Sequence, residues 1–259
     1  MAIKEKQTKY QVYRKTTSFA KSIIIPCFAL LFFSQNTLFA QVISNTGANI
    51  SVSSIAVVGS KDLENSAGTL GNNGTINLSG NFSNSGTTNG NGYYNLLGNW
   101  TDLGSFNAGT STVTLYGSTN QTITHGSSGE TFYNLIINNP GIVTQIANPG
   151  STLGVLKDLS LIAGTLSLHS STSFLTIGGK ATINGALLYN GITTQTTTIG
   201  DILSGPGTIN MSGGSLSHVL NLAGATNAIG TFTTSGAGSS TVNYNGTNQT
   251  VFAANNSEI

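Results

Sequence analysis

Residues 68–106 read GTLGNNGTINLSGNFSNSGTTNGNGYYNLLGNWTDLGSF, and a glycine returns in them at every sixth position. These glycines are Gly68, Gly74, Gly80, Gly86, Gly92, Gly98 and Gly104. An apolar residue stands two positions after six of the seven, as in Ile76, Phe82 and Trp100. A fixed interval of this kind is the signature of a repeat architecture, in which short units stack on one another.

A second, threefold longer period overlies the first. Residues 77–83 (NLSGNFS) recur as residues 95–101 (NLLGNWT) at an offset of 18, and residues 62–66 (DLENS) recur as residues 81–85 (NFSNS) at an offset of 19. Units this short cannot bury enough apolar surface to offset their lost backbone entropy, so they must share a core with their neighbours. No segment after residue 40 has a sustained helical pattern, whereas short β-rich phrases alternate with Gly/Asn turns. The sequence therefore predicts an all-β, single-chain parallel β-helix, or β-solenoid.

Two observations bear on the hand of this coil. Three six-residue sides per turn resemble the left-handed hexapeptide helix. Later spacings are uneven, with an offset of 22 from Leu159 to Ala181 and of 21 from Ala181 to Ile202. Because right-handed solenoids accommodate uneven turns better, we favour a right-handed coil. Eight side chains are expected to form the inward core stack: Leu63, Leu70, Ile76, Phe82, Trp100, Phe106, Leu159 and Ile202.

A larger repeat is present near the end of the sequence. Residues 111–117 (STVTLYG) with 120–123 (NQTI) return as residues 240–246 (STVNYNG) with 248–251 (NQTV). The first copy continues into the strand-like residues 131–137 while the second ends at Ile259, which predicts that the chain is part of a longer tandem array. We divide the sequence into a signal peptide (1–40), a short-turn solenoid with the six-residue glycine period (41–109), a solenoid module (110–237) and the start of a second copy of the module (238–259).

Residues 1–40 are typical of a secretory signal. Six Lys and Arg residues precede an apolar run at residues 23–33, and Ala40 offers a small residue to signal peptidase. The run is well short of the ~20 residues that a membrane-spanning helix needs. We therefore expect cleavage between Ala40 and Gln41, with no transmembrane helix in the mature chain. Cys27, the single cysteine, leaves with this segment, which excludes disulfides and cysteine metal sites from the mature chain.

The mature chain is almost uncharged. It keeps three scattered lysines against seven acids, for a net charge of −4. Three lysines cannot form the basic patch that displaces counterions from phosphates, so nucleic-acid binding is excluded. Charged residues are commonly about a quarter of a globular protein, so Thr, Ser and Asn must cover this surface instead.

Three phrases carry a resemblance to a known class: residues 74–82 (GTINLSGNF), 104–113 (GSFNAGTSTV) and 131–139 (TFYNLIINN). They resemble the β-solenoid repeats of large secreted surface proteins of Gram-negative bacteria, which are filamentous-haemagglutinin-like and similar to adhesins exported by the type IX system. The resemblance covers most of residues 45–259. It implies a secreted or cell-surface location at the Gram-negative exterior, and glycans, extracellular matrix or neighbouring cell surfaces as partners.

Some parallel β-helices are polysaccharide lyases or hydrolases, whose sites need clustered carboxylates. Asp62, Asp158 and Asp201 fall at a repeat position that elsewhere holds Asn81, Asn99 or Lys180, which indicates a solvated corner. His125, His169 and His218 each lack a histidine or carboxylate at ligand spacing. We therefore expect no catalytic residue, no cofactor and no metal site.

The function expected is that of a non-catalytic, extracellular structural or adhesive repeat region. A carbohydrate-active enzyme on a right-handed β-helix remains the alternative, and it would have acids and Lys or Arg from adjacent turns on one face. Trp100 is expected to point inward, although an exposed sugar platform is the other possibility. The run at residues 193–198 (TTQTTT) raises an ice-binding solenoid, which would have Thr at one outward position in most turns.

Overall fold

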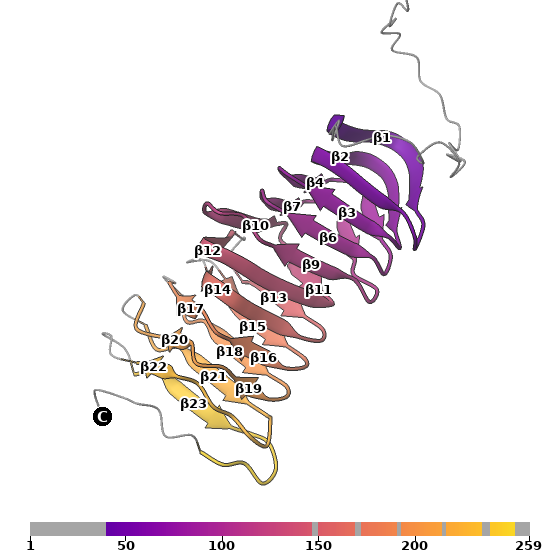
Figure 1. The fold of residues 1–259 in the computed structure, drawn as a ribbon. Helices are drawn as coiled ribbons and strands as arrows, with labels where there is room; N and C mark the ends of the chain where they lie inside the picture. Colours follow the sequence, from indigo (N-terminus) through magenta and orange to yellow (C-terminus); the bar gives the residue numbers. More distant parts are fainter. Residues whose placement is uncertain are drawn as a thin grey trace, which may run out of the picture.

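The computed structural model describes residues 40–146, 150–168, 172–190, 193–213, 216–234 and 239–251. Within these residues the chain is all-β and winds as one elongated stack of parallel strands, a β-solenoid (Figure 1). The predicted signal peptide, up to residue 39, lies outside the described residues. The first strand begins at Ala40, beside the predicted cleavage site.

Successive turns place their strands on three faces. The first turns are long bent strands, β1 (Ala40–Val52) and β2 (Val57–Asn72). Face 1 contains β3 (Thr75–Leu78), β6 (Tyr93–Leu96), β9 (Thr112–Leu115), β16 (Ala181–Ile183) and β19 (Leu203–Ser204). Face 2 contains β4 (Phe82–Asn84), β7 (Trp100–Asp102), β10 (Gln121–His125), β17 (Ala186–Tyr189), β20 (Thr208–Asn210) and β22 (Thr231–Thr233). The long strands β12 (Asn134–Ile146) and β14 (Leu159–Leu168) contribute to both.

Face 3 is divided between two sheets. It contains β5 (Thr87–Asn89) and β8 (Ser105–Asn107), followed by β11 (Glu130–Phe132), β13 (Ser151–Val155), β15 (Thr172–Ile177), β18 (Thr196–Ile199), β21 (Val219–Leu222) and β23 (Thr241–Tyr244). β5 and β8 belong to the same 17-stranded sheet as faces 1 and 2, whereas β11 begins a separate six-stranded sheet. Among the described strands no hydrogen-bonded ladder joins β8 to β11, so face 3 has a seam at this level.

The turns are in parallel register, and their length varies along the chain, with the shortest turns before Val113 and the longest between Leu135 and Leu159. On face 1 the inward column runs Ile76, Tyr94, Val113, Leu135, Leu159, Ala181 and Leu203. The offset along the sequence is 18 from Ile76 to Tyr94 and 24 from Leu135 to Leu159. Every member of the column is buried, so one continuous apolar interior serves all the turns.

Seven of the eight side chains expected in the inward stack contribute to this core, on different faces. Leu63, Phe82 and Trp100 are in register on face 2, with the Phe82 and Trp100 rings stacked 4.2 Å apart. Leu70 and the partly buried Phe106 lie on face 3, and Ile76 and Leu159 lie on face 1. The inward direction expected for Trp100 agrees with its complete burial.

The expectation for Ile202 is wrong by one residue. Leu203 pairs with Ala181 and is fully buried, whereas Ile202 is only half-buried at the preceding corner. The offset from Ala181 to its true partner is therefore 22, equal to that of the turn before it. Because inward and outward positions alternate along a strand, a slip of one residue moves a side chain out of the core.

Close packing of the corners accounts for the glycine period. A Cβ added to Gly92, Gly98 or Gly104 would collide with the carbonyl oxygen of Gly74, Gly80 or Gly86, one turn earlier. Each glycine thus stacks on the glycine of the previous turn, and the turn has three such columns. Each corner lets the backbones of successive turns approach more closely than any side chain allows.

The two copies of the larger repeat have the same local structure but lie on different faces of the coil. Thr112–Leu115 lies on face 1, whereas its counterpart Thr241–Tyr244 lies on face 3. In both copies a glutamine side chain closes the corner that follows the strand: Gln121 accepts from the Gly117 N–H at 3.0 Å, and Gln249 accepts from the Gly246 N–H at 2.7 Å. Each glutamine also donates to two carbonyl oxygens of the previous turn. The phrase is therefore a strand-and-corner unit that fits more than one side of the coil.

Candidate functional site

Face 1 exposes one column of outward side chains that are all uncharged and, apart from Ile136, polar. Strand register places the outward residues in line, one per turn: Asn77, Asn95, Thr114, Ile136, Ser160, Thr182 and Ser204. Asn95 Nδ2 donates to Asn77 Oδ1 at 2.9 Å, so part of the column is itself a hydrogen-bonded ladder. Parallel strands lie roughly 4.8 Å apart, and a hydrogen-bonding side chain therefore recurs along the axis at that interval except at Ile136.

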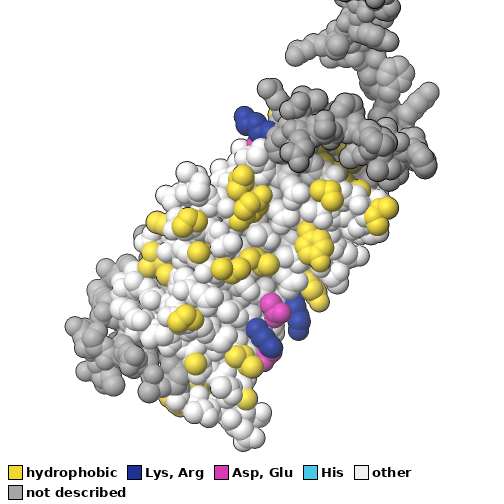
Figure 2. All heavy atoms as spheres, viewed as in Figure 1, with side chains coloured by type: hydrophobic (Ala, Val, Ile, Leu, Met, Phe, Trp, Pro, Cys, Tyr) yellow, Lys and Arg dark blue, Asp and Glu magenta, His cyan; other side chains and the backbone are white. Residues whose placement is uncertain are grey.

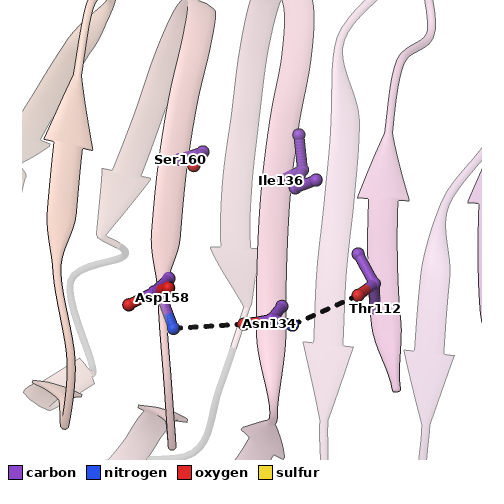
Figure 3. A pocket seen from close by; sticks show the side chains of 5 residues that line it. All are labelled: Thr112, Asn134, Ile136, Asp158 and Ser160. Carbon is purple, nitrogen blue, oxygen red and sulfur yellow. Dashed lines mark hydrogen bonds between the residues drawn. The ribbon is translucent and has the colours of Figure 1, made fainter. Parts of the chain in front are cut away.

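An open hollow of about 230 Å³ lies on this face between β9, β12 and β14. It is lined by Thr112, Asn134, Ile136, Asp158 and Ser160 (Figure 3). Asn134 Nδ2 donates to Thr112 Oγ1 at 3.3 Å, and the Asp158 backbone N–H donates to Asn134 Oδ1 at 3.3 Å (Figure 3). The hollow thus combines hydroxyl, amide and carboxylate groups around one aliphatic side chain.

Tyr93 extends this site along the axis. It pairs in register with Thr112, which pairs with Asn134, so the three outward side chains follow one another on successive turns. Tyr93 is 56% exposed. An exposed aromatic ring beside convergent polar groups is a combination suited to binding a hydroxyl-rich ligand, because the ring offers an apolar face and the polar groups fix orientation.

Face 3 carries the threonines singled out in the sequence. Thr196 and Thr198 lie outward on β18, whereas Thr197 is buried. One outward rank reads Thr131, Gly154, Thr176, Thr198, Asn221, Asn243, and the other reads Thr152, Phe174, Thr196, Val219, Thr241. Threonine thus alternates with glycine, asparagine and apolar residues, including a Phe174 side chain that is 47% exposed. Threonine holds three of the six places in the first rank and three of the five in the second, so neither rank is an unbroken threonine array.

Asp62 and Asp158 lie at corners, and the structure corrects how these acids were grouped with Asp201. Asp62, Asn81 and Asn99 share one slot, where each side-chain oxygen accepts the backbone N–H of the next turn at 2.6–2.8 Å. Asp158 and Lys180 share another corner, with the Lys180 N–H donating to Asp158 Oδ1 at 2.8 Å. One turn later the residue at this corner is Ile202 and not Asp201, because the Ala181 N–H donates to the carbonyl oxygen of Ile202. Figure 2 shows how sparse these charges are on a mostly polar, uncharged face.

A separate set of polar side chains, some of them titratable, lies inside the coil. Asn45, Asn65 and Asn84 form a buried ladder, each Nδ2 donating to the next Oδ1 at 2.7–2.8 Å, and Asn84 donates onward to Asp102 Oδ1 at 2.7 Å. His125 is in register with Asp102 on the next turn. Glu130 accepts from Trp100 Nε1 through Oε2 and from the Thr131 N–H through Oε1, both at 2.9 Å.

Burial dominates the protonation of this cluster. Desolvation raises the pKa of Glu130 to about 8, with the nearby Asp102 carboxylate adding to the rise. Desolvation also raises the pKa of Asp102 above its usual 3.8, and it lowers the pKa of His125 below 6.5. His125 Nδ1 lies 3.0 Å from Gly126 O, and Nε2 lies 2.9 Å from Gln145 Nε2, which fits a neutral ring that donates through Nδ1 and accepts at Nε2.

Sequence spacing missed this cluster. His125 was expected to have no acidic neighbour, yet the structure brings Asp102 beside it. The signal was present as the column Asn65, Asn84, Asp102, whose regular spacing could have been extended by one longer turn to His125. Of the remaining candidates, His218 is buried, donates through Nε2 to Gly213 O and accepts the Gln195 N–H at Nδ1, while His169 and Glu258 lie outside the described residues.

The buried position of the cluster limits its chemistry. Asp102, His125 and Glu130 are all buried within the coil, and each exposes at most 7% of its surface. Within the described ranges, no group of three or more His, Cys, Asp or Glu side chains is arranged to hold a metal ion. The same part of the chain has no helix long and apolar enough to cross a membrane.

The fold and surface define a parallel β-solenoid with polar, nearly uncharged faces and an internal polar ladder. The sequence matches no protein-family model, and no curated protein or solved structure matches the chain.

Proposed function

We propose that the mature chain is a non-catalytic structural and adhesive region of a bacterial cell-surface protein, a right-handed rod that presents polar faces to glycans, matrix or neighbouring cells. The observation that carries the proposal is the column on face 1 with its adjoining hollow. Uncharged hydrogen-bonding groups recur there on successive turns, beside an exposed Tyr93 ring. A repeating, hydroxyl-rich polymer is the partner that such a periodic surface complements.

The placement of the carboxylates supports this proposal over the enzyme alternative. Glycoside cleavage needs two carboxyl groups that flank a substrate at a surface cleft. Here the close pair, Asp102 and Glu130, lies inside the coil, while Asp62 and Asp158 serve as acceptors for backbone N–H groups. These roles stabilise the stack of turns.

Binding is tested with the full chain, secreted and labelled, on an array of neutral polysaccharides and matrix proteins. Asn95→Glu, Thr114→Glu and Ser160→Glu together place three carboxylates on face 1, and we expect them to abolish binding. The matched control places three on face 3 with Thr176→Glu, Thr198→Glu and Asn243→Glu, and should bind normally. Equal binding by both variants, binding to nothing on the array, or new reducing ends released from a polysaccharide would each contradict the proposal.

Export is tested on the same material. N-terminal sequencing of the secreted chain should begin at Gln41, and surface labelling of intact cells should detect it. A chain that retains residues 1–40 inside the cell contradicts the proposed location.

A further inference from the structure

The seam lies on face 3 between β8 and β11. At this place only side chains connect the two successive turns. At the same level β6 pairs with β9 and β7 pairs with β10, so faces 1 and 2 continue without interruption. Between β8 and β11 the backbone ladder is missing. Whatever holds face 3 closed at this level must therefore come from the residues that meet across the seam.

Aromatic rings provide the apolar part of that closure. Phe106 of β8 lies 6.0 Å from Phe132 of β11, and both rings contact Trp100 of β7, at 4.9 Å and 5.3 Å between centroids. These contacts are edge-on or tilted, and they do not replace directional backbone hydrogen bonds.

Glu130 provides the polar part. It is the first residue of β11, it is buried, and it accepts the Trp100 Nε1–H from β7 at 2.9 Å. The carboxyl group of Asp102 lies close by, and its negative charge raises the pKa of Glu130. Two ionised carboxylates repel each other in a buried site, which favours the state in which one of the two groups holds a proton. The titratable groups facing Glu130 are Asp102 of β7 and, beyond it, His125 of β10, while Leu153 of β13 is its apolar neighbour in register.

We propose that this seam is a proton-controlled joint in the rod, closed while Glu130 holds a proton and opened between β8 and β11 when Glu130 releases that proton to solvent. Ionised Glu130 would face the Asp102 carboxylate in a buried site, where like charges repel and each charge lacks water. Opening exposes both groups to water and breaks no backbone ladder. Faces 1 and 2 remain paired, so the rod loosens on one side only. The inference is independent of what the rod binds.

The single tryptophan of the chain reports directly on this joint. Trp100 fluorescence of the full chain is followed from pH 6 to 9.5, together with quenching by acrylamide. We expect one transition with a midpoint near pH 8, with red-shifted emission and easier quenching on the alkaline side. Over the same range the unfolding equilibrium constant should rise roughly tenfold per pH unit up to the midpoint.

Variants assign the transition to Glu130. Glu130→Gln removes the ionisable group and keeps an acceptor for Trp100 Nε1–H, although its amide cannot also accept the Thr131 N–H, and it should give fluorescence that is flat with pH. The matched control Glu64→Gln removes an exposed carboxylate elsewhere and should titrate like the parent chain. Asp102→Asn removes the neighbouring negative charge and should lower the midpoint, which supplies a second test if Glu130→Gln does not fold.

Hydrogen exchange locates the opening. After correction for intrinsic rates, the amide of Thr131, which donates to Glu130 Oε1 in the closed joint, should lose protection above the midpoint, while the amides of β6, β9 and β10 keep theirs. A parent chain without a transition, a transition that persists in Glu130→Gln, a midpoint unchanged in Asp102→Asn, or uniform loss of protection on all three faces would each overturn the proposal.

Discussion

Asn84 Nδ2 donates a 2.7 Å hydrogen bond to Oδ1 of Asp102, the residue directly in register with it on the next turn. Both side chains are buried, and the same Asn84 accepts from Asn65 Nδ2 on the turn before. The interior of the N-terminal turns is therefore a ladder of side-chain amides beside a stack of apolar residues. Because every rung needs a partner above and below, this ladder fixes register more strictly than hydrophobic packing alone.

The ladder predicts a large effect of Asn84→Ala. Truncation removes a partner from both Asn65 and Asp102 inside the core, and we expect the free energy of unfolding to fall by about 2 kcal/mol. Asn95→Ala removes a rung of the half-buried ladder on face 1, where water replaces the lost bond, and should cost about 0.5 kcal/mol or less. Urea denaturation measures both. Equal losses would show that the internal ladder has no special role.

Glycine stacking predicts that Gly98→Ala is strongly destabilising. The new methyl group would meet the Gly80 carbonyl at a corner where only backbone atoms can move, and overpacking of this kind costs about 1–3 kcal/mol. Gly126→Ala is the control, because no atom lies within 4 Å of the added Cβ. Thermal unfolding compares the two variants, and a stable Gly98→Ala chain would contradict the explanation of the six-residue period.

The corrected register predicts which of two neighbouring residues matters. Leu203→Ala should lower the free energy of unfolding by about 2–5 kcal/mol, because Leu203 completes the buried column of face 1. Ile202→Ala, at the half-buried corner, should cost about 1 kcal/mol or less. If urea denaturation showed Ile202→Ala to be the more destabilising variant, Ile202 would be the core residue and the register described here would be wrong by one residue.

The burial of His125 predicts that the Glu130→Gln variant loses stability in acid. Burial lowers the pKa of His125 in the folded chain, so below pH 6.5 the unfolded chain binds a proton that the folded chain does not, and stability falls with pH. In the parent this loss is masked, because Glu130, with its raised pKa, makes the opposite contribution between its unfolded value of 4.5 and about 8. In Glu130→Gln we expect a loss of stability over the first pH unit below 6.5, because the buried ring resists protonation. Unchanged stability across that unit would show that the ring is not held neutral.

Much of the architecture could be predicted from the sequence, because the interval between glycines reports the length of a turn. The offset of 19 between Leu63 and Phe82 and the offset of 18 between Phe82 and Trp100 are the registers that the structure has. These early turns are short and nearly identical in length, so an alignment of their sequence repeats also pairs the residues that are in register.

The later turns could not be aligned as precisely, because their corners differ in length. A corner can absorb an extra residue without disturbing the strands, so Asp201–Ile202 resembled Asp158–Leu159 although Leu203 is the core residue. The same freedom lets one phrase occupy face 1 in Thr112–Leu115 and face 3 in Thr241–Tyr244. The contact between Asp102 and Glu130 crosses from face 2 to the seam of face 3, and no periodicity along one face predicts it.

Disulfide formation between adjacent turns tests the parallel, in-register stack most directly. Ser160 and Thr182 are outward neighbours on face 1, and parallel strands hold such Cα atoms roughly 4.8 Å apart, within the roughly 4.4–6.8 Å range that disulfides span. In a chain that also carries Cys27→Ser, Ser160→Cys combined with Thr182→Cys should oxidise within a single chain, as measured by mass spectrometry of proteolytic fragments. Ser160→Cys combined with Thr198→Cys, on face 3, should remain reduced. Efficient crosslinking of the second pair, or none of the first, would contradict the stacking on which the whole account depends.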